Sequence, residues 1–122
     1  MMGRENVLKE KSFAFALRIV NAYKYLTSEK KEFILSKQLI RSGTSIGALV
    51  REAEYAQSVA DFISKMSIAL KETSETEYWL LLLKSNDYIE EEVFLSISTD
   101  CQELLKLLIS TINTSKKKLN KN

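Results

Sequence analysis

The sequence predicts an all-α protein, folded as one antiparallel up-and-down four-helix bundle. The 122 residues include no proline and only three glycines, so the turn residues that an all-β or βαβ fold needs are scarce. Apolar residues also recur at three- and four-residue intervals through four long segments. A chain of this length can bury a sufficient core without a metal or a disulfide. We expect residues 1–115 to form the bundle domain and residues 116–122 a basic disordered tail.

The first helix is predicted from Glu10 to Leu26. Its core stripe consists of Leu8, Phe15, Ile19, Tyr23 and Leu26, and Phe13, Leu17 and Val20 extend it sideways. That apolar surface is wider than a single core requires.

The second helix is predicted from Glu29 to Tyr55, from the spacing of its apolar residues. Gly43 and Gly47 lie four residues apart on the flank of its apolar stripe, where each costs about 1 kcal/mol relative to Ala. We interpret them as sites of close packing against a neighbouring helix. The alternative is a helix distortion near a binding site.

The third helix is predicted from Val59 to Lys84, because Ser58 and Asp61 have the spacing of an N-terminal cap. Ile68, Trp79 and Leu82 lie nearly opposite its core stripe. This helix is therefore apolar on two sides, which a monomeric bundle does not require of a surface helix. The sequence thus predicts a closed homo-oligomer.

The fourth helix is predicted from Tyr88, with Asp87 as its cap, to about Thr114, where it should fray into the lysine tail. Cys101 lies inside its apolar stripe, so we interpret it as a small buried hydrophobic residue rather than a reactive thiol.

Composition excludes several classes of site. The chain has no His and a single Cys, so His-based catalysis, an internal disulfide and a zinc site are ruled out within it. We expect no catalytic residue, no metal site and no cofactor. No secretory signal or membrane span is recognisable, and one unpaired Cys fits a reducing compartment, so we expect a cytoplasmic protein without a membrane role.

Three segments resemble a known bacterial family. Residues 36–48 (SKQLIRSGTSIGA), 61–72 (DFISKMSIALKE) and 75–80 (ETEYWL) resemble the four helix bundle proteins, also called 23S rRNA-intervening sequence proteins. The resemblance implies an antiparallel bundle, assembly into a ring that is a pentamer in relatives, and no known catalysis. It also implies kinship with the accessory protein of diversity-generating retroelements, which binds reverse transcriptase and nucleic acid. Relatives usually carry Asn where this chain has Leu49.

The lysines near the C-terminus are the first candidates for nucleic-acid binding. Lys116, Lys117, Lys118 and Lys121 are accompanied by no acid, and the net charge of +2 would be negative without them. In a pentamer the four lysines become about twenty, enough to bind phosphates through counterion release without sequence selectivity. Lys37 and Arg41, on one face of the second helix, are secondary candidates. The alternative is an inert, solvated terminus.

A second group of polar residues is predicted to form a network within or between subunits. Its members are Arg41, Glu52, Lys65, Glu72, Glu75 and Trp79. Ion pairs among them would fix the register of helices or subunits. The carboxylates could in principle form an acid–base pair or a metal site, but no further acid cluster accompanies them. Trp79 is expected to pack, the alternative being base stacking.

Two functions remain open at this stage. In the first, a non-enzymatic homo-oligomer binds RNA or DNA nonspecifically. In the second, the oligomer is a scaffold for a partner protein and has no nucleic-acid role.

Overall fold

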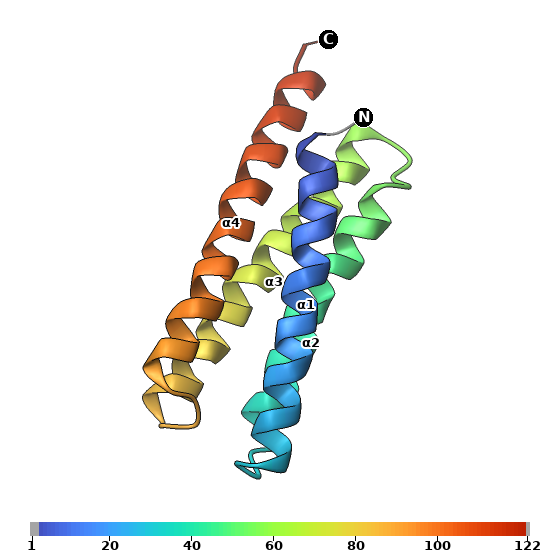
Figure 1. The fold of residues 1–122 in the computed structure, drawn as a ribbon. Helices are drawn as coiled ribbons and strands as arrows, with labels where there is room; N and C mark the ends of the chain where they lie inside the picture. The colour runs from blue at the N-terminus through green and yellow to red at the C-terminus, as the bar shows by residue number, and fades with distance from the viewer. Residues whose placement is uncertain (1–2, 122) are drawn as a thin grey trace.

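The computed structural model describes residues 3–121 and shows four helices packed side by side (Figure 1). They are α1 (Arg4–Ser28), α2 (Leu35–Ala53), α3 (Val59–Ser85) and α4 (Glu91–Leu119). Each helix runs antiparallel to the one before it and contacts it, and α4 returns to α1, where the contact is least extensive. No strand occurs within residues 3–121. The all-α four-helix fold predicted from the sequence is confirmed.

A continuous core of apolar side chains joins the four helices. Its large, fully buried members include Phe15, Ile19, Leu39, Ile46, Met66, Leu80, Leu104 and Leu108. Removing each such side chain from water contributes about 1.5–3 kcal/mol, before the entropy of ordering the chain is counted. Cys101 belongs to this core, as expected. Among the described helices, none has the length and apolar character needed to cross a bilayer.

The connection between α1 and α2 differs from the prediction. Helix α1 begins at Arg4 instead of Glu10, and α2 begins at Leu35 instead of Glu29. The chain turns at Lys31, whose φ of 53° is left-handed. The carboxylate of Glu32, only 8% exposed, then accepts hydrogen bonds from the backbone N–H groups of residues 34, 35 and 36 at 3.1, 2.9 and 2.7 Å. Glu32 thus supplies the acceptors that an N-cap residue normally provides.

The start of α3 agrees with the prediction. The backbone N–H of Asp61 donates to the hydroxyl of Ser58 at 3.0 Å, and the Asp61 carboxylate accepts from the N–H of Gln57. The predicted cap is confirmed.

The start of α4 does not agree with the prediction. Asp87, predicted as its cap, has a left-handed φ of 65° and ends α3 instead, with Tyr88 N–H donating to the Leu83 carbonyl at 2.9 Å. Helix α4 therefore begins only at Glu91.

Helix α4 also ends later than predicted. It does not fray after Thr114 but continues to Leu119. Lys116, Lys117 and Lys118 therefore lie in its last turn rather than in a disordered tail, and Lys121 follows just beyond it. Cations are favourable there, since the helix dipole places partial negative charge at the C-terminus.

The outer surface carries exposed apolar side chains on α1, as the sequence indicated. On α3 the agreement is partial, because of the expected Ile68, Trp79 and Leu82 only Ile68 is exposed and the other two are half-buried. Phe13 and Leu17, one helical turn apart on α1, are 54% and 52% exposed. Ile68, Tyr78 and Leu81 of α3 are exposed as well. Single exposed apolar residues are common, but neighbouring ones on one face are typical of an interface.

Candidate nucleic-acid interface

The lysine cluster, which we define as Lys116, Lys117, Lys118 and Lys121, lies at the end of the bundle where α1 begins and α2 ends (Figure 1). All four residues are exposed, and none makes an ion pair or side-chain hydrogen bond with a described residue. From Leu104 onward the sequence contains no Asp or Glu. The ammonium groups are therefore available to an external anion.

Several cations elsewhere on the bundle are already paired. Lys9 of α1 contacts both oxygens of Glu54 at 3.0 and 3.2 Å. Lys11 contacts Glu103 of α4 at 3.0 Å. Arg18 of α1 reaches Asp100 of α4 at 2.8 Å and donates to the Ser96 hydroxyl at 2.9 Å. Such exposed pairs contribute little to stability, but they neutralise the surface around them.

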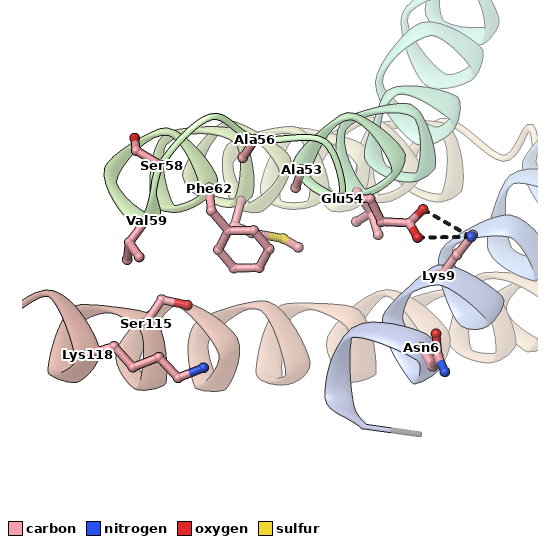
Figure 2. A pocket seen from close by; sticks show the side chains of 12 residues that line it. Asn6, Lys9, Ala53, Glu54, Ala56, Ser58, Val59, Phe62, Ser115 and Lys118 are labelled. Carbon is pink, nitrogen blue, oxygen red and sulfur yellow. Dashed lines mark hydrogen bonds and ion pairs between the residues drawn. The ribbon is translucent and has the colours of Figure 1, made fainter. Parts of the chain in front are cut away.

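A pocket of about 440 Å³ opens beside the lysine cluster, lined by residues from all four helices and from the α2–α3 connection (Figure 2). Its apolar part is formed by Val50, Ala53, Ala56, Val59, Phe62 and Met66. Its polar part is formed by Asn6, Lys9, Glu54, Ser58, Ser115 and Lys118. Lys118 thus belongs both to the lysine cluster and to the pocket. The cluster and the pocket therefore form a single site.

The secondary candidates Lys37 and Arg41 lie elsewhere. Both are exposed on the outer face of α2, and neither has an ion-pair partner among the described residues. Lys37 stands near the start of α2, roughly 24 Å along the helix axis from its end at Ala53, which lines the pocket. The structure therefore does not bring Lys37 together with the lysine cluster within one chain.

The expected polar network is present only in part. Lys65 lies 3.9 Å from Glu52 and 3.7 Å from Asp61. The side chains of Arg41, Glu72 and Glu75 make no ion pair with any residue in the described range. Their charges are thus available for contacts outside the chain.

Trp79 packs partly against the core and meets Tyr78 edge to face, with ring centroids 5.1 Å apart. Its indole Nε1 is buried yet has no hydrogen-bond partner among the described residues.

Both helical glycines lie where α2 meets α1. A Cβ at Gly43 would stand 2.8 Å from Cγ1 and Cγ2 of Ile19, whereas one at Gly47 would stand 3.5 Å from the Ser12 carbonyl oxygen. The approach is thus much closer at Gly43.

Comparison with protein-family models identifies a relationship over most of the chain. Residues 4–110 match the model described as 23S rRNA-intervening sequence protein. The chain belongs to the 23S rRNA-intervening sequence protein family. The match ends before the lysine cluster, so the cluster lies outside the part of the chain that this family model matches.

A solved structure of similar sequence has the same fold. It is a protein of unknown function from the S23 ribosomal protein family of Bacteroides thetaiotaomicron. Its sequence is 60% identical to that of this chain. The alignment covers 91% of this chain and 99% of the other, with a TM-score of 0.90. A comparison with curated proteins gave no match.

Sequence reasoning missed two features. Glu32 was not recognised as the residue that caps α2, and no pocket was predicted, because its lining residues are far apart in the sequence.

The described residues include no group of three or more His, Cys, Asp or Glu able to hold a metal ion.

Proposed function

We propose that this chain is a non-enzymatic, self-associating cytoplasmic protein that binds nucleic-acid phosphates through the lysine cluster. The supporting observation is that four lysines gather at one end of the bundle without a carboxylate partner among the described residues. Lysine contacts to phosphate release condensed counterions, which favours binding without reading the base sequence. RNA is the first probe to use, since the family description refers to 23S rRNA.

Self-association would multiply this effect. The exposed apolar residues on α1 and α3 are suited to contacts between copies of the chain, and the resemblance noted above suggests a pentamer. Each added copy brings a further lysine cluster to the assembly, so affinity for a long polyanion rises by avidity. A scaffold that binds only a partner protein through the same apolar faces is the alternative function.

The test replaces Lys116, Lys117, Lys118 and Lys121 with Gln and measures RNA affinity by fluorescence anisotropy at constant ionic strength. A matched control replaces four exposed lysines elsewhere, Lys24, Lys30, Lys31 and Lys71, and so changes the net charge equally. We expect the first variant to lose affinity at least tenfold more than the control. Equal losses would attribute binding to net charge alone, and no RNA binding by the unmodified chain would favour the scaffold.

A further inference from the structure

We propose that the pocket beside the lysine cluster accepts one unstacked base of a single-stranded nucleic acid, stacked on Phe62, while Lys118 holds the adjacent phosphate. This inference rests on the proposed function and adds to it a preference for single strands.

The volume and lining of the pocket suit a base. Its volume of about 440 Å³ lies within the usual range of small-molecule sites. Within the helices, α2 and α3 supply apolar side chains and α1 and α4 supply polar ones, while the α2–α3 connection adds Glu54, Ala56 and Ser58. A nucleobase has the same division, with apolar faces and hydrogen-bonding edges.

Phe62 provides the stacking surface. Figure 2 shows its ring extending from α3 toward α4 into the pocket. The ring is half-buried and packs against the core, so it is held in place before any ligand arrives. Aromatic rings bind successive bases of single strands in this way, with little dependence on which base is present.

Polar groups on α4 face the same space. Ser115 is only 8% exposed, and its hydroxyl makes no hydrogen bond with a described residue. It can donate to, or accept from, the edge of a base.

The charges of the pocket favour an anion on the α4 side. Lys9 is neutralised by Glu54, with which it makes two contacts (Figure 2). Lys118 has no such partner in the described chain, and the exposed Lys117 and Lys121 are close to it in the sequence. A strand can therefore run along the lysine cluster and turn one base into the pocket. Bases of a duplex are stacked and paired, so a base can enter the pocket only at the free-energy cost of unpairing and unstacking it.

The experiment compares a single-stranded RNA with a duplex of the same length, for the unmodified chain and for Phe62→Leu. The substitution removes the aromatic face but keeps an apolar side chain. Phe94→Leu is the matched control, because Phe94 is a half-buried aromatic residue that does not line this pocket. Ala56→Leu, which places bulk at the pocket wall, tests the same claim without removing the ring.

We expect Phe62→Leu and Ala56→Leu each to weaken single-strand binding about tenfold and to leave duplex binding unchanged. The control Phe94→Leu should change neither affinity. Circular dichroism confirms that each variant is folded. If Phe62→Leu affects both probes equally, or no more than Phe94→Leu does, the base pocket is refuted while the lysine cluster stands. If the quadruple Lys→Gln variant keeps the affinity that Phe62→Leu loses, the proposed function and the phosphate contact of Lys118 are both wrong, and only the stacking of a base on Phe62 stands. Absence of RNA binding at low salt overturns both.

Discussion

Gly43 of α2 and Ile19 of α1 meet more closely than a side chain at position 43 allows. A Cβ there would lie 2.8 Å from both branches of the isoleucine, whose position is fixed because it is fully buried. Since both branches start at the isoleucine Cβ, rotation cannot move them both away. This contact sets how near α1 and α2 approach.

Gly43→Ala should therefore lower the free energy of unfolding by about 1–2 kcal/mol, because overpacking outweighs the gain in helix propensity. Gly47→Ala should raise it by about 0.5–1 kcal/mol, because a Cβ there makes only an ordinary contact with Ser12. Urea unfolding of the two variants measures both values. Equal effects at the two positions would contradict the account of this helix pair.

Glu32→Gln should destabilise the fold by about 1–3 kcal/mol at neutral pH. Burial of Glu32 opposes ionisation, but the backbone N–H groups of residues 35, 36 and 34 outweigh it and lower its pKa below the ordinary value of 4.5. Gln offers one acceptor oxygen in place of two. The exposed Glu29→Gln, in the same connection, is the control and should change little.

The pH dependence of this contribution has a definite sign. Because the folded-state pKa is lowered, the ionised carboxylate of Glu32 stabilises the fold at pH values above 4.5, and the benefit is lost as the pH falls through the lowered pKa. The difference in unfolding free energy between the unmodified chain and Glu32→Gln should thus shrink on acidification from pH 6 toward pH 3. A constant difference would show that the carboxylate does not act in its charged form.

Cys101 should resist thiol reagents in the native protein. Burial, together with the nearby charges of Glu77 and Asp100, raises the pKa of its thiol to about 12, and its Sγ donates a hydrogen bond to the Thr73 carbonyl at 3.3 Å. The thiolate, which is the reactive form, is therefore scarce at pH 8. Labelling should be slow without urea and fast in unfolding urea concentrations. Rapid labelling of the folded protein would mean that this part of the core opens readily.

Self-association should depend on Phe13 and Leu17. Replacing both with Ser removes an exposed apolar pair without opening the core. We expect light scattering to show a multiple of 14.0 kDa for the unmodified chain and a lower mass for the variant, with helicity unchanged. Tyr55→Ser, an exposed aromatic residue in the α2–α3 connection, serves as the control. A mass of 14.0 kDa for the unmodified chain at micromolar concentration would refute self-association.

The helices themselves could be predicted from the sequence because apolar periodicity and helix caps depend on residues within one or two turns of each other. Ser58 and Asp61 show this, since their spacing alone locates the start of α3. Glu32 and Asp87 show the limit: each acts through backbone conformation, left-handed at Lys31 and at Asp87, that no apolar pattern encodes. The lysines were found from composition, but their helical conformation was not.

The pocket illustrates a different limit. It joins Asn6, Phe62 and Lys118, which are far apart in the sequence, and no pattern within one helix relates them. It forms only where all four helices and the α2–α3 connection meet in the folded chain.

The salt dependence of RNA binding tests the central claim most directly. Each single-strand phosphate contact contributes about −0.7 to the slope of log affinity against log salt concentration. We predict that replacing the four lysines with Gln makes this slope less negative by about 2–3 for each lysine cluster that contacts the RNA, and weakens binding similarly for all RNA sequences. If the substituted chain has the same slope and affinity as the unmodified one, the lysine cluster does not bind RNA and the proposed function is contradicted.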